Sequence, residues 1–197
     1  REPWRTSRGL CAFISNSNTI QGRYVFKLLH RGPYWMKLKE RHQPRKDTLL
    51  EILRDLEAIS PEFAKLLPEG AKVEVATTDK GDPYILVDGE VAIFKGEKGY
   101  FPTVRGALKI QADRRFVTVD KGAIPYVASG ADVMLPGVVA FDPALKKGDL
   151  VIVNEESHKK PLAIGTALWD GEELRTKDRG KCVKVLQHVG DEVWALA

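Results

Sequence analysis

The stretch from residue 119 to residue 138, VDKGAIPYVASGADVMLPGV, has the residue types for noncovalent recognition. Small side chains from Ser129 to Ala131 leave the backbone approachable, and Lys121 supplies a cation nearby. An open backbone beside a cation can receive a sugar-phosphate chain or an unstacked terminal base. The alternative interpretation is that the glycines of this stretch serve only the geometry of turns.

The rest of the chain offers no comparable set for covalent chemistry. The four histidines are scattered, and no HExxH, GxSxG or GxxxxGK[ST] pattern occurs. We therefore expect no enzyme, no cofactor and no metal site. The histidines are His30, His42, His158 and His188.

The net charge of +4 is unevenly distributed along the chain. Residues 1–46 hold 11 Lys and Arg against 2 Asp and Glu, whereas residues 47–197 hold 20 against 25. The pI near 9.0 therefore reflects a basic head. Nucleic-acid binding must rest on a local patch rather than on the total charge.

Residues 1–35 show neither helical nor alternating periodicity, and the clear pattern begins at Met36. We expect 1–35 to be a leader that is not native or is disordered, with Met36 as the natural start. Two cysteines, Cys11 and Cys182, are too few for a disulfide framework and favour a reducing compartment. No apolar run is long enough to span a membrane, so we expect a cytoplasmic protein.

Residues 36–113 predict a small mixed domain. Thr48 and Glu51 fit a capping box for one helix, and Ser60-Pro61 predicts the start of a second helix ending near Pro68. The runs KVEVATT, YILVDG and EVAIFK then predict strands joined by tight turns. KGEKGY is typical of a hairpin turn, and PTVRGALKI predicts a short helix.

Residues 114–197 read as a small barrel of short strands. The predicted strands are RFVTV, DVML, DLVIVNE, LAIGTALW, KCVKVLQH and VWAL. AIPYVASG allows about two helical turns, after which Gly130 is expected in a left-handed conformation. The fold class predicted for the whole chain is α+β.

The same stretch, VDKGAIPYVASGADVMLPGV, closely resembles the signature of the PUA domain, an RNA-binding module. KKGDLVIV, PLAIGTALW and VWAL are similar to its later strands, so the resemblance covers residues 114–197. YFPTVRGALKI ahead of it resembles the malignant T-cell amplified sequence family and its archaeal relatives, which are also similar to ligatin. This implies an N-terminal α/β pre-PUA domain at 36–113 and a C-terminal PUA pseudo-β-barrel at 114–197.

The family resemblance also implies partners. Its eukaryotic members work with a SUI1-domain factor on small ribosomal subunits and tRNA. We therefore expect a non-enzymatic, translation-linked protein whose PUA domain binds tRNA or ribosomal RNA, with the tRNA acceptor end as the favoured target. The N-terminal domain is expected to dock the small subunit or a SUI1-type partner. Two alternatives are an accessory RNA-recognition subunit of an RNA-modification enzyme and a protein-interaction adaptor.

The predicted RNA contacts are cations near the glycine motif together with the motif itself. Tyr126, Met134 and Leu135 are expected mainly in the core, as are Trp169 and Trp194. The charged pair Lys146-Lys147 is expected to be a solvated surface. The predicted RNA-binding residues are Lys109, Arg114, Arg115, Lys121, Gly122, Ser129, Gly130, Ala131, Asp132 and Met134.

Overall fold

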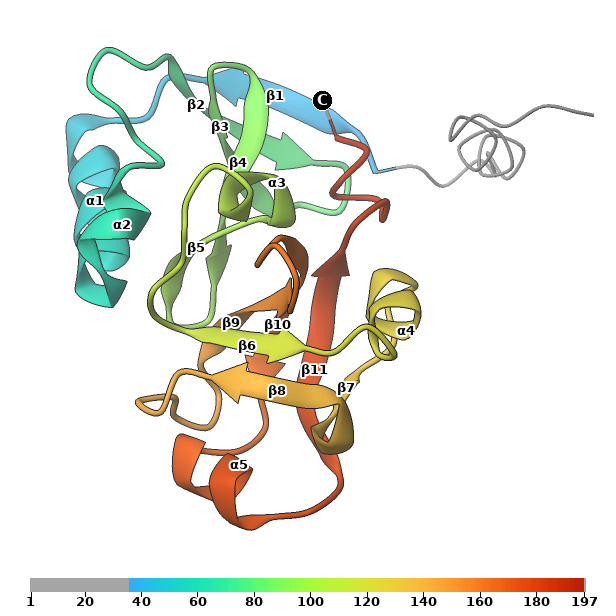
Figure 1. Ribbon diagram of the computed structural model, residues 1–197. Helices are drawn as coiled ribbons and strands as arrows, with labels where there is room; N and C mark the ends of the chain where they lie inside the picture. Colours follow the sequence, from blue (N-terminus) through green and yellow to red (C-terminus); the bar gives the residue numbers. More distant parts are fainter. Residues whose placement is uncertain (1–35, 197) are drawn as a thin grey trace, which may run out of the picture. The chain divides into compact units, whose positions relative to one another are not determined.

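The computed structural model describes residues 36–196, which build two sheets with short helices (Figure 1). The first sheet has five strands in the order β1-β2-β3-β4-β5, and the second has six in the order β7-β11-β10-β9-β6-β8. This arrangement confirms the α+β class. The expected leader 1–35, with Cys11 and His30, lies outside the described residues.

The first sheet is an antiparallel meander. Its strands run in chain order, and α3 (Val104–Ala107) follows the last of them, as predicted. KGEKGY forms the turn between β4 and β5, which confirms the hairpin, while β1 and β5 had not been predicted as strands. The strands are β1 (Leu38–His42), β2 (Val73–Thr78), β3 (Pro83–Val87), β4 (Glu90–Gly96) and β5 (Gly99–Pro102).

Two helices precede the second strand. α1 (Lys46–Ile59) begins two residues before Thr48, with Arg45 at its N-cap, so the predicted capping box is wrong. Arg45 has an extended backbone and makes no side-chain cap hydrogen bond, so the first turn begins without a capping side chain. α2 (Pro61–Ala64) starts as predicted, with the Ser60 hydroxyl accepting a hydrogen bond from the Glu62 amide, but it ends before Pro68.

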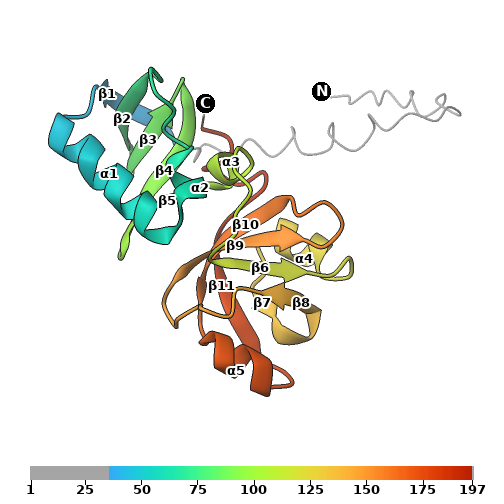
Figure 2. The ribbon, with the colours of Figure 1, turned by 60° about the vertical axis from the view of Figure 1, so that its left-hand side comes forward.

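The second sheet curls into a partly closed barrel (Figure 2). In it, β6 runs parallel to β9 and antiparallel to β8, and β7 pairs with β11. The elements are β6 (Phe116–Val119), α4 (Ile124–Ala128), β7 (Val133–Met134), the 3-10 turn η2 (Leu135–Gly137), β8 (Val138–Phe141), β9 (Leu150–Glu155), β10 (Pro161–Ala167), α5 (Gly171–Thr176) and β11 (Lys181–His188).

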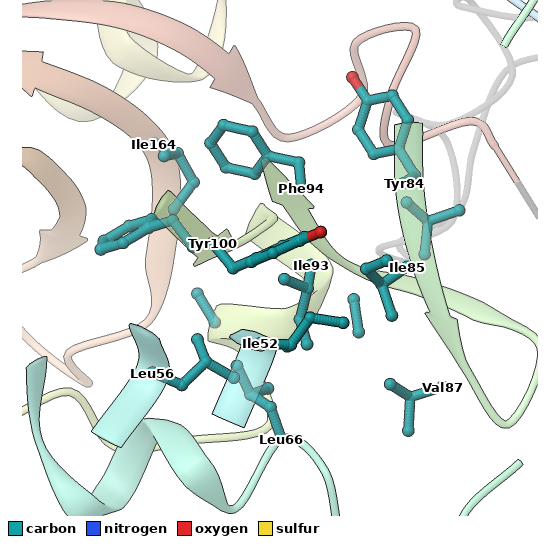
Figure 3. Packing of buried hydrophobic residues seen from close by; sticks show 14 of the residues in the cluster. Ile52, Leu56, Leu66, Tyr84, Ile85, Val87, Ile93, Phe94, Tyr100 and Ile164 are labelled. Carbon is teal, nitrogen blue, oxygen red and sulfur yellow. The ribbon is translucent and has the colours of Figure 1, made fainter. Parts of the chain in front are cut away.

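The hydrophobic core of the first sheet extends into the second. Ile52 and Leu56 of α1 pack onto β3 and β4, and Ile152 and Ile164 from β9 and β10 join the same cluster. Figure 3 shows Ile164 next to these N-terminal side chains. Burying aliphatic side chains from both sheets in one cluster stabilises their association.

The C-terminal segment corrects one strand prediction. VWAL forms turns rather than a strand. Its Leu196 is buried in the cluster of the first sheet, and Trp194 packs beside it. Arg105 holds the segment in place, because its Nε donates to the Trp194 carbonyl at 2.8 Å and its guanidinium lies 4.6 Å from the indole centroid.

Candidate nucleic-acid interface

The predicted RNA contacts fall into three separate places in the structure. Lys109 lies in the turn after α3, Arg114 and Arg115 precede β6, and the residues from Lys121 to Met134 follow β6. β6 has four residues, which span roughly 13 Å at about 3.3 Å per residue. The predicted RNA-binding residues are therefore divided between the two ends of β6 and the turn after α3.

Two of the three predicted cations outside the motif, Lys109 and Arg114, lie near carboxylates. The Lys109 ammonium lies 2.6 Å from Glu90, on the hairpin between β3 and β4. Arg114 lies 3.9 Å from Asp142, and the Arg115 amide donates to the same carboxylate at 2.8 Å. These contacts fit structural roles at the start of β6, because Asp142 is buried and needs partners.

The turn after α4 is closed by its own hydrogen bonds. The amides of Ser129 and Ala131 both donate to the Tyr126 carbonyl, at 3.1 and 3.0 Å, and the Gly130 amide donates to Val127 at 3.0 Å. The backbone that the sequence suggested as approachable therefore has these three amides engaged within the turn. A short helix must satisfy its last carbonyls, and the following amides do so here.

Gly130 has the left-handed conformation that the sequence predicted, with φ at +91°. A Cβ built there would lie 2.8 Å from Nε2 of His188, so the imidazole covers one side of this glycine. Gly122 has no such requirement: its φ lies outside the left-handed region, and its nearest neighbour would be Asp120 Oδ1 at 3.3 Å. Only the first of these two glycines is demanded by the backbone.

Asp132 anchors the loop to β11. One carboxylate oxygen lies 2.6 Å from the Lys181 ammonium, and the other accepts a hydrogen bond from the Val185 amide at 2.9 Å. The hydrogen bond from Lys181 and then that from Val185 hold the pKa of Asp132 below its ordinary value. Asp132 and Lys181 together fix the path of the chain from Gly130 to Met134.

Two apolar side chains of this region face the solvent. Tyr126 on α4 is 68% exposed and Met134 on β7 is 52% exposed, so their expected core positions are wrong. Leu135 is buried as predicted, and Trp169 packs against the core of the second sheet. The exposed ring of Tyr126 offers a face on which an unstacked base can lie.

Lys121 supplies the positive charge at this end of β6. Its amide donates to Glu156 at 3.2 Å, which fixes the turn. Within residues 36–196 its ammonium has no carboxylate within ion-pair distance, and the residue is exposed. Sequence analysis named this lysine but missed Tyr126, Lys181 and His188. The missing signal was the pairing of β7 with β11, which places Met134 opposite Lys181.

The remaining reactive groups do not form a further chemical site in the described part of the chain. Cys182 is buried, and desolvation raises the pKa of its thiol to about 11. Within residues 36–196 no three His, Cys, Asp or Glu side chains gather as metal ligands. Among the same residues, no helix has the length and apolar character needed to cross a membrane.

Comparison with known proteins shows which family this chain resembles. The PUA domain model matches residues 115–189. An uncharacterized protein of Methanocaldococcus jannaschii is 39% identical over 159 residues, covering 81% of this chain and 98% of that protein. Translation machinery-associated protein 20 of Saccharomyces cerevisiae is 26% identical over 176 residues, covering 86% and 97%.

A solved structure agrees with these relatives. The crystal structure of a hypothetical protein from Pyrococcus horikoshii matches with a TM-score of 0.70 at 37% identity, covering 79% of this chain and 98% of that one. Sequence and fold thus point to the same group, which contains both archaeal and eukaryotic proteins. The chain belongs to the malignant T-cell-amplified sequence family of PUA-domain proteins.

Proposed function

We propose that this protein is a non-enzymatic, translation-linked RNA-binding protein of the cytoplasm, whose PUA domain binds structured RNA at the tRNA acceptor end. The observation that carries the proposal is the exposure of Tyr126 at the Gly130 turn, with the exposed Met134 four residues after Gly130 in the chain. Lys121 adds a charge at the same end of β6 that has no ion-pair partner among residues 36–196. We propose residues 36–113 as the N-terminal domain and residues 114–197 as the PUA domain.

The proposed mechanism is positioning. An unpaired terminal base stacks on the Tyr126 ring, and Met134 contributes apolar contact. Lys121 neutralises a phosphate of the same strand. Because the amides from Ser129 to Ala131 are already hydrogen-bonded within the turn, recognition rests on side chains and on shape rather than on those amides.

The direct experiment is fluorescence anisotropy of labelled tRNA titrated with the 197-residue chain. Two RNAs are compared, one intact and one lacking its unpaired 3′ nucleotides, at two salt concentrations. The proposal predicts salt-sensitive binding that weakens on trimming, because the stacked base is lost while the phosphates remain. Equal affinity for the two RNAs would contradict end recognition, and absence of binding to both would favour the protein-adaptor alternative.

We propose further that the N-terminal domain docks the small ribosomal subunit or a SUI1-type partner. Leu50 supports this part, because it lies on α1 with 59% of its surface exposed. The name of the yeast relative refers to the translation machinery. Co-sedimentation with purified small subunits tests the docking: Leu50→Glu should reduce the bound fraction, whereas Leu108→Glu, at a 45% exposed site after α3, is the matched control.

A further inference from the structure

The hairpin between β9 and β10 has a shape fixed by one buried carboxylate. Glu155 accepts hydrogen bonds from three amides of the hairpin, those of Ser157 at 2.6 Å, Lys160 at 3.2 Å and His158. Burial alone would raise the pKa of Glu155, but these three amides outweigh it and lower the pKa. The carboxylate of Glu155 is thus hydrogen-bonded to the backbone of its own turn.

The next residue joins this hairpin to the turn that carries Lys121. Glu156 accepts the Lys121 amide at 3.2 Å, and Val119 at the end of β6 is the register partner of Glu155. The two turns therefore lie side by side at the same end of the sheet. Figure 2 shows the β9–β10 hairpin and the turn after β6 projecting on the side of the sheet where α4 lies.

Glu155 and Glu156 of the hairpin bind backbone amides, and the lysines of the hairpin face the solvent. Lys159 and Lys160 are exposed, and in the part of the chain described here neither ammonium has a carboxylate within ion-pair distance. Lys159 has a φ of 57°, which marks the tip of the turn. With Lys121, three uncompensated lysines stand on two joined turns.

The same end of the sheet holds the Gly130 turn. His188, whose ring covers Gly130, is the register partner of Ala163, and Ala163 lies three residues after Lys160 at the start of β10. The lysines therefore border the Gly130 turn and α4, which carries Tyr126, rather than the Arg114 end of β6. A chain that places a base on Tyr126 would continue toward these cations.

We propose that Lys121, Lys159 and Lys160 form a phosphate-binding site that holds the backbone of the RNA next to the nucleotide stacked on Tyr126. This inference rests on the proposed function and adds a second source of affinity for RNA. Lysine ammoniums act as point charges on phosphates and carry no base preference. The site therefore contributes salt-dependent affinity, while the Tyr126 surface contributes selectivity for an unpaired end.

The test uses matched pairs of adjacent lysines at opposite ends of the sheet. Lys159→Ala/Lys160→Ala should weaken tRNA binding on the order of tenfold and lower the salt slope by about one to two. Lys146→Ala/Lys147→Ala, in the connection between β8 and β9, is the control and should leave both unchanged. Thermal melting of each variant verifies that the fold is intact.

Intact and trimmed tRNA separate this inference from the function on which it rests. The loss caused by Lys159→Ala/Lys160→Ala should be the same for both RNAs, because the phosphates remain after trimming. If trimming weakens binding but the two lysine pairs behave alike, the phosphate site is wrong and end recognition stands. If poly-glutamate at equal charge displaces the RNA as well as unlabelled tRNA does, the site binds anions in general and its assignment to RNA is overturned.

Discussion

The two ends of β6 use similar residue types in different ways. At the start of the strand, acidic side chains pair with cations: Asp142 with Arg114, and Asp149 with Lys98 at 3.1 Å. At its end, Glu155 and Glu156 bind backbone amides, and within residues 36–196 neither forms an ion pair with Lys121, Lys159 or Lys160. Because Lys146 and Lys147 at the start are exposed as well, the two ends differ less in available charge than in surroundings: only the end of β6 places its lysines next to α4, which carries the exposed Tyr126.

The largest expected effect comes from glycines at the two ends. Gly130 has φ +91° and Gly148, between β8 and β9, has φ +83°. Alanine at either position should destabilise the fold by about 1–3 kcal/mol. Gly130→Ala should cost more, because its Cβ would meet His188 at 2.8 Å, whereas Gly148→Ala meets the flexible end of Lys98 at 3.3 Å.

Chemical denaturation measures the free energy of unfolding of Gly130→Ala and of Gly148→Ala. Titration of labelled tRNA with each folded variant measures its RNA affinity. RNA affinity should fall for Gly130→Ala alone. A loss of affinity in Gly148→Ala that equals the loss in Gly130→Ala would remove the functional distinction between the two ends.

A smaller effect is expected from the exposed aromatic ring. Tyr126→Ala should weaken binding of intact tRNA by roughly 5- to 100-fold, because base–aromatic stacking contributes about 1–3 kcal/mol per base. Anisotropy titration measures this, with Leu50→Ala on α1 as a control of similar exposure. The effect should shrink for trimmed tRNA; a Tyr126→Ala loss that is the same on both RNAs would mean that the ring does not contact the end nucleotide.

The smallest predicted effect concerns pH. The pKa of Asp132 is lowered in the folded protein, so its contribution to stability is present above the pKa of the unfolded chain and is lost as the pH falls below about 4. The melting temperature of Asp132→Asn should therefore fall less steeply than that of the parent protein as the pH is lowered through this range. An acid-side melting profile identical to that of the parent protein would show that the Asp132–Lys181 contact does not stabilise the loop.

The sequence predicted most of the strands, though not β1 or β5, together with the short helix α4 and the left-handed Gly130, because local patterns of hydrophobicity and glycine encode them. It failed on Tyr126, because α4 has five residues, too few for periodicity to separate the buried Val127 from its exposed neighbour. It also placed Arg114 near the glycine motif. The two are close in sequence, but the extended strand β6 separates them in the structure. The pairing of Lys121 with the β9–β10 hairpin depends on a parallel strand contact, which no local pattern reveals.

The most direct test of the account compares charge reversals at the two ends of β6. Lys121→Glu, Arg114→Glu and Lys146→Glu are titrated against intact tRNA at low and moderate salt, after melting curves have established that each is folded. The account predicts that Lys121→Glu weakens binding and lowers the salt slope by about one, while the other two variants match the parent protein. Weaker binding in Arg114→Glu or Lys146→Glu, with Lys121→Glu unchanged, would contradict the placement of the RNA at the α4 end.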